Sequence, residues 1–191
     1  MDVLTVIVVS SVSFGRTVIG LVFRPYETYR RIVSHGRFGE LALVAFLIVV
    51  YFAFSGITRV IAVFGSYCIT LASFWLAGRI VRVKFHLGTL AIAWGYTLIP
   101  TLVWFLMTSL LYVILPPPRT TTALGISFSV VFLMFSATLL WWKMMLSYLT
   151  IRFVFKIDLP RIALMCTIVI PIVTAYSALL YYLGIFKVPF L

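Results

Sequence analysis

Long runs of apolar residues, separated by short basic or proline-rich segments, make up most of the chain. Five of these runs are close to or longer than the roughly 20 residues that a helix needs to cross a hydrocarbon core about 30 Å thick. They cover residues 38–57, 60–78, 87–115, 123–142 and 162–184. They do not alternate between apolar and polar residues as barrel strands do, so each run predicts a helix that satisfies its own backbone hydrogen bonds in lipid.

The third run is too long for one straight crossing. Its 29 residues would extend about 43 Å as an unbroken helix. Gly95, Tyr96 and Pro100 lie within it, and a proline removes a backbone donor and clashes with the preceding turn. We therefore predict a kink or break near Pro100, and an end to the helix at the three prolines of positions 116–118.

Small residues recur along one face of the second run. Their spacings of four, four, three and four residues form a stripe that lets another helix approach closely. Packing inside the bundle and an interface with a partner both fit this stripe. Its members are Ala62, Ser66, Thr70, Ser73 and Ala77.

The N-terminal segment precedes these five spans. Residues 3–23 are apolar apart from Arg16 and a few small polar residues. We favour a peripheral or interfacial segment, with a sixth span as the alternative, in which Arg16 near mid-helix would cost about 2.5–3.5 kcal/mol. Residues 24–33 predict a short amphipathic helix on the inner leaflet, because Pro25 suits a helix start and the tyrosines lie opposite the arginines.

These elements predict an all-α fold, a polytopic bundle of about five transmembrane helices with an N-terminal interfacial amphipathic segment. We expect two parts: residues 1–37 on the cytoplasmic side, and a five-span membrane domain over residues 38–191. Composition agrees, since 64% of the 191 residues are hydrophobic and 10% are charged, against about 45–50% and 25% in soluble domains.

The charge of the chain is strongly basic, with a net value of +11 from 15 Lys and Arg against 4 Asp and Glu. Because the basic residues form short clusters between apolar runs, we interpret them as topology signals and contacts with anionic lipid, and expect no nucleic acid partner. The candidate contacts for anionic lipid or a partner are Arg24, Arg30, Arg31, Arg79, Arg82, Lys84, Arg152, Lys156 and Arg161.

The placement of these charges predicts an orientation. With a cytoplasmic N-terminal segment, twelve of the 15 basic residues fall inside and three, Arg59, Arg119 and Lys187, fall outside. This bias obeys the positive-inside rule and places the C-terminus outside, in the plasma membrane if the chain is prokaryotic. Lys143 follows two tryptophans, which we interpret as the inner interface, where its ammonium would reach water. The helix would continue towards Arg152.

The ionisable residues form no recognisable catalytic or metal site. The acids lie outside the runs or at their margins, and the histidines lie in basic segments: Asp2, Glu27, Glu40, Asp158, His35 and His86. Cys68 and Cys166 lie inside apolar runs, and we interpret them as small buried hydrophobic side chains. The sequence has no Gly-x-Ser-x-Gly motif and no clustered zinc ligands. We therefore expect a non-enzymatic protein without cofactor or metal.

Two motifs resemble a known family. Residues 24–32, Arg-Pro-Tyr-Glu-Thr-Tyr-Arg-Arg-Ile, are similar to the Pro-x-x-Thr-aromatic-Arg-x-aliphatic lead-in of prokaryotic members of the Yip family of membrane proteins. Residues 95–100, Gly-Tyr-Thr-Leu-Ile-Pro, resemble the family's Gly-Tyr-x-x-x-Pro. The five-span layout and the orientation agree with that family. Its eukaryotic members are associated with small GTPases, vesicle traffic and membrane shaping, but their acidic and aromatic cytoplasmic motif is absent here.

The resemblance and the lack of catalytic groups lead to one functional expectation and one alternative. We expect a membrane scaffold or accessory subunit of a larger membrane assembly, whose partners are membrane lipids, other membrane proteins or a second copy. The alternative is a channel or transporter subunit with a substrate path near the break at Pro100. A water-filled cavity reaching Pro100 would favour the alternative, and a tightly packed bundle there would count against it.

Overall fold

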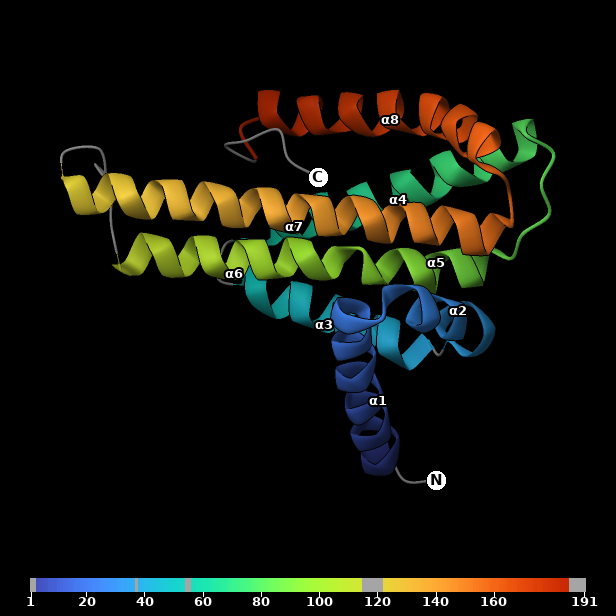
Figure 1. Ribbon diagram of the computed structural model, residues 1–191, viewed down its shortest axis with the longest axis horizontal. Coiled ribbons are helices and arrows are strands. Elements are labelled where there is room, and N and C mark those ends of the chain that lie inside the picture. The colour runs from blue at the N-terminus through green and yellow to red at the C-terminus, as the bar shows by residue number, and fades with distance from the viewer. Residues whose placement is uncertain (1–2, 37, 54–55, 115–121, 186–191) are drawn as a thin grey trace.

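Helices make up the regular structure of the described chain (Figure 1). The computed structural model describes residues 3–36, 38–53, 56–114 and 122–185. Its elements are α1 Val3–Phe23, α2 Pro25–His35, α3 Phe38–Ala53, α4 Ile57–Ile80, α5 Leu87–Tyr96, α6 Leu98–Ile114, α7 Ala123–Phe155 and α8 Leu159–Tyr182. The predicted all-α fold is confirmed.

Four helical stretches of the described chain are long and apolar enough to cross a membrane. They are Ile57–Ile80 in α4, Leu87–Ile114 over α5 and α6, Ala123–Phe155 in α7 and Leu159–Tyr182 in α8. α2 and α3 together would form a fifth, broken crossing, with a bend of 113° between them. These apolar helices make the chain an integral membrane protein, with four or five candidate spans in the part that the structure describes.

The first predicted span, 38–57, differs from the structure at its end. α3 ends at Ala53, and Ile57 is the first residue of α4. Gly56 precedes α4 with φ of 105°, a conformation that glycine adopts without steric cost, so the chain turns there. With 16 residues, α3 extends about 24 Å, which is less than the hydrocarbon thickness of about 30 Å.

The other predicted spans agree with helices to within a few residues. The runs 60–78 and 123–142 lie inside α4 and α7, and α7 continues through Arg152, as predicted, and ends three residues later at Phe155. The run 87–115 corresponds to α5 and α6, apart from Leu115, which lies outside the described residues. The run 162–184 ends too late, because α8 stops at Tyr182 and Gly184 has a positive φ of 68°.

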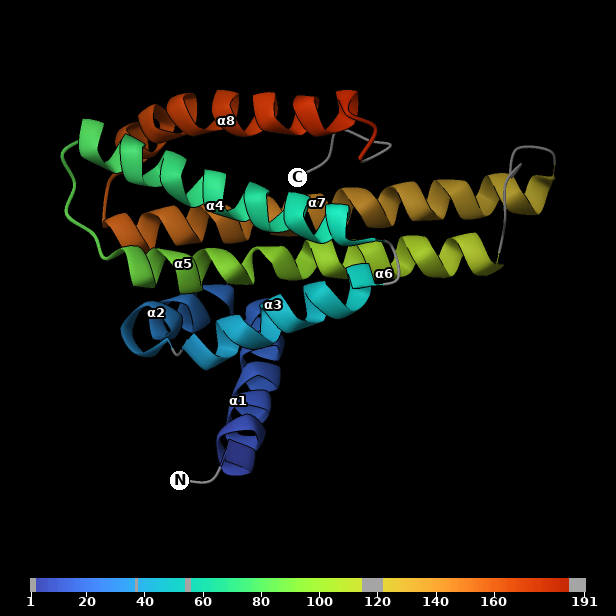
Figure 2. The same cartoon turned by 180° about the vertical axis from the view of Figure 1, so that it is seen from behind.

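The helices from α4 to α8 run along the long axis of the molecule, whereas α1 lies across it (Figures 1 and 2). α8 packs on α4, and α6 packs on α7. α5 contacts α2, α3 and α7, so it links the N-terminal helices to the bundle. Within α1, the stretch Val9–Phe23 is apolar, and both the interfacial placement of residues 3–23 and the sixth span stay predictions.

The break predicted near Pro100 lies three residues earlier, at Thr97 between α5 and α6. Pro100 has no N–H to donate to the carbonyl of Tyr96, and its ring crowds that carbonyl. The backbone N–H of Thr97 instead bonds to the carbonyl of Trp94 at 2.9 Å, one residue short of the α-helical pattern. The proline therefore acts on the turn that precedes it.

Candidate functional site

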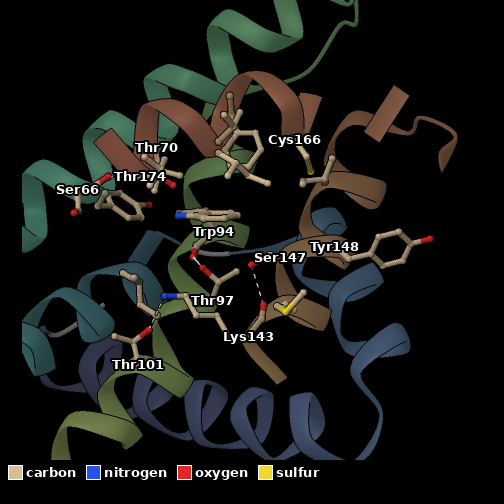
Figure 3. A pocket seen from close by; sticks show the side chains of 18 of the residues that line it. Ser66, Thr70, Trp94, Thr97, Thr101, Lys143, Ser147, Tyr148, Cys166 and Thr174 are labelled. Atoms are coloured by element: carbon tan, nitrogen blue, oxygen red, sulfur yellow. Dashed lines mark hydrogen bonds between the residues drawn. The ribbon is translucent and has the colours of Figure 1, made fainter. Parts of the chain in front are cut away.

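A cavity of about 470 Å³ separates the α4–α8 pair from α5, α6 and α7 (Figure 3). Most of its lining is apolar, from residues such as Phe74, Trp94 and Val169. The lining includes an ammonium and eight hydroxyls: Lys143, Ser66, Tyr67, Thr70, Thr97, Thr101, Ser147, Tyr148 and Thr174. The cavity therefore has the character of a site for a lipophilic molecule with a polar group.

Backbone carbonyls accept from several of these hydroxyls. Thr70 donates to the carbonyl of Ser66 at 2.8 Å, and Thr97 donates to the carbonyl of Trp94 at 2.7 Å. Ser147 donates to the carbonyl of Lys143 at 2.8 Å. Hydroxyls bonded in this way present little free polarity to the cavity, which keeps its lining compatible with a hydrocarbon chain.

Lys143 on α7 lies at the wall of the cavity beside the helix break. Its Nζ donates to Oγ1 of Thr101 on α6 at 3.0 Å (Figure 3). The sequence interpretation placed this ammonium at the inner interface, yet its hydrogen bond runs across the bundle to α6. Sequence reasoning missed this contact because the two residues lie on different helices, 42 positions apart in the chain.

A second cavity, of about 500 Å³, lies between α6 and α7. It shares Thr101, Leu140 and Lys143 with the first cavity, and Pro100 also lines it. Trp104 in its lining donates from Nε1 to Oγ of Ser136 at 3.0 Å. Two cavities therefore meet at the pair formed by Lys143 and Thr101, next to the break.

A buried polar cluster joins α1, α3 and α5 away from these cavities. Glu40 is only 6% exposed and accepts from the hydroxyls of Tyr96 and Ser13, the latter at 2.7 Å from Oε1. Arg31 reaches the same region and donates to Oγ1 of Thr17 at 3.3 Å. Sequence reasoning put Glu40 at the margin of a span, and missed that α1 and α5 enclose it.

The α2 helix has the amphipathic pattern that the sequence predicts. Its apolar face packs inside the protein, because Tyr29 and Ile32 are buried in the main hydrophobic core. Tyr29 donates to the carbonyl of Ala93 at 3.3 Å and accepts from Thr150 at 3.1 Å. The apolar face of α2 therefore packs against the helix bundle.

The nine basic residues predicted as lipid or partner contacts are all exposed. They lie in α2 or just before it, at the end of α4 and in the segment after it, at the end of α7 or just after it, and at the start of α8. These helix ends lie together at one end of the bundle (Figures 1 and 2). Arg24 lies 3.8 Å from Glu27, and the guanidinium of Arg79 lies 4.4 Å from the centre of the Trp75 ring. Arg119 and Lys187 lie outside the described residues.

The stripe of small residues on α4 is buried at all five positions: Ala62, Ser66, Thr70, Ser73 and Ala77. α8 is the main neighbour of α4, and Tyr176 on α8 donates to the carbonyl of Ala62 at 3.3 Å. Packing inside the bundle accounts for this stripe without a second protein.

The three residues predicted at the helix break, Gly95, Tyr96 and Pro100, are buried. Gly95 lies against the side chain of Leu41 on α3, where a larger residue would displace Leu41. The break is therefore packed against α3 on one side, while its other side reaches the cavities.

The described residues contain no group of three His, Cys, Asp or Glu side chains that could hold a metal ion. The prediction that both cysteines are buried is wrong for Cys68, which is exposed on α4, while Cys166 on α8 is partly buried and lines the first cavity. The geometry of this region therefore supports binding by shape, hydrogen bonds and one positive charge.

No protein-family model, no curated protein and no solved structure matches the chain. Membership of the Yip family accordingly stays a prediction from the two motifs, and the functional argument rests on the geometry of the chain itself.

Proposed function

We propose that this chain is the substrate-binding subunit of a membrane transporter or channel assembly, and that it binds a lipophilic molecule at the break between α5 and α6. One observation carries the proposal: two cavities meet at the Lys143–Thr101 hydrogen bond, and Pro100 lines one of them. Because the lining is mostly apolar, a molecule that dissolves in the bilayer fits it better than a hydrated ion does.

The proposed orientation places the basic end of the bundle in the cytoplasm. This end carries the exposed arginines and lysines of α2, α4, α7 and α8, and cytoplasmic segments are enriched in such residues. Contact with anionic head groups of the inner leaflet would follow from the same placement.

A second candidate function is that of a non-enzymatic accessory subunit or scaffold in a larger assembly, as the resemblance to the Yip family implies. The observation that favours it is the far end of α6 and α7, which extends beyond α4 and α8 (Figures 1 and 2). Apolar side chains there are exposed, including Val113 at 80% and Leu133 at 69%. In a larger assembly, a neighbouring membrane protein would replace lipid on this surface.

Native mass measurement separates the two candidates. Protein purified in mild detergent is expected to retain a small lipophilic molecule. Thr174→Phe, at a position that lines the cavity, is expected to abolish the retained mass. Ala175→Phe introduces the same ring at an exposed neighbouring position outside the lining and should leave it unchanged.

A stoichiometric second protein in place of the small molecule would favour the accessory subunit. Equal retention of the lipophilic mass by Thr174→Phe and wild type would contradict binding in the cavity.

A further inference from the structure

The first cavity, of about 470 Å³, carries a positive charge in its mostly apolar lining. Among the described lining residues Lys143 supplies a positive charge, and no aspartate or glutamate lines either cavity. A lysine ammonium carries a full positive charge and three donors, and Lys143 donates to Thr101. Ionisable side chains inside membrane spans are costly, so one that turns towards a cavity indicates a functional group.

The hydroxyl of Ser66 at this cavity makes no hydrogen bond. Ser66 is 7% exposed. Thr70 and Ser73 on the same helix bond to the carbonyl four residues earlier. The corresponding carbonyl for Ser66 belongs to Ala62, which accepts from Tyr176. Buried hydroxyls are nearly always hydrogen-bonded, so the Ser66 hydroxyl is available to a polar group of a ligand.

The cavity opens between α7 and α8. Leu140 and Met144 on α7 and Ile170 on α8 line it, yet they are 53%, 58% and 59% exposed. Since α7 and α8 both belong to the membrane-crossing stretches, this opening faces the hydrocarbon of the bilayer. A ligand with a chain can therefore enter sideways from the lipid.

We infer that the first cavity binds a single-chain amphiphile with a carboxylate head, which accepts a hydrogen bond from Lys143 while its hydrocarbon chain follows the apolar lining towards the gap between α7 and α8. The inference rests on the proposed function and names its substrate class. A volume of about 470 Å³ lies in the lower part of the range of ligand sites, which suits one hydrocarbon chain.

Trp94 gives a direct readout because it lines the cavity (Figure 3). The probes are dibrominated stearate and the dibrominated alcohol of the same chain, whose bromine atoms quench nearby tryptophan fluorescence. The signal from the cavity is the quenching that wild type shows and Trp94→Phe lacks. Because a charge-assisted hydrogen bond distinguishes the two probes, stearate should bind about tenfold more tightly than the alcohol.

Substitutions at Lys143 test the cause of this preference. Lys143→Met should reduce stearate binding to the level of the alcohol, and Lys143→Arg, which keeps the charge, should restore most of the preference. Equal binding of both probes to wild type, or a preference that survives Lys143→Met, would overturn the carboxylate inference while leaving lipophile binding intact. Absence of Trp94 quenching by either probe would overturn the proposed function as well.

Discussion

Tyr96, the last residue of α5, donates a hydrogen bond to the carboxylate of Glu40 on α3. The bond holds the break between α5 and α6 against the N-terminal helices, since Ser13 of α1 donates to the same carboxylate. Both Glu40 and Tyr96 are buried. The position of the break, and with it the shape of the cavities, therefore depends on a polar contact between elements far apart in the chain.

The first prediction concerns this carboxylate. Glu40→Ala leaves the hydroxyls of Tyr96 and Ser13 without their acceptor, and should lower the free energy of unfolding by about 1–3 kcal/mol. Thermal unfolding in detergent measures the loss. Glu27→Ala is the control, because Glu27 is exposed and its removal should change stability by less than about 0.5 kcal/mol. Equal effects of the two substitutions would contradict the role of Glu40.

The second prediction concerns the anchoring of α2. Tyr29→Phe removes the hydroxyl that bonds to the Ala93 carbonyl and to Thr150, and should destabilise the fold by about 1 kcal/mol. Tyr26 lies on the same helix, and 57% of its surface is exposed. Tyr26→Phe should therefore unfold at the temperature of wild type, and a shift as large as that of Tyr29→Phe would argue against the buried contact.

The third prediction concerns the α4–α8 interface. Ala62→Leu adds three carbons where the residue is 4% exposed and its carbonyl accepts from Tyr176, so overpacking should cost about 1–3 kcal/mol. Ala72→Leu makes the same change at an exposed position of α4 and should be near neutral. Thermal stability unchanged in both variants, together with a loss of oligomers in Ala62→Leu, would instead assign the stripe to a partner.

The fourth prediction concerns orientation. In a background with both native cysteines replaced by serine, a membrane-impermeant maleimide added to intact cells should label Thr122→Cys, at the start of α7. It should label Lys84→Cys, in the basic segment before α5, only after the membrane is opened. The reverse pattern would place the basic end outside and refute the predicted topology.

Local chemistry explains how much of the fold the sequence predicts. Runs of apolar residues are contiguous in the chain, so the helices and most of their bounds follow from length and composition. Pro100 predicts a break because its effect reaches only one turn back, and the break is found at Thr97. The end of α3 was misplaced because the positive φ of Gly56 is one of several conformations open to glycine.

The polar contacts could not be predicted in the same way. In the sequence, Lys143 follows two tryptophans, a pattern typical of a lysine at the membrane interface. Only the packing of α6 on α7 brings it to Thr101. Glu40 reads as the margin of a span, and only the position of α1 across the bundle brings Ser13 to it. Hydrophobic periodicity carries no information on such pairs, since each depends on which helices become neighbours.

The most direct test of the central claim is an experimental density map of the protein crystallised from a lipid phase. The account predicts elongated non-protein density between α7 and α8 that begins beside Lys143 and Thr101. A map in which α7 and α8 close against each other, so that no space remains beside Lys143, would contradict it.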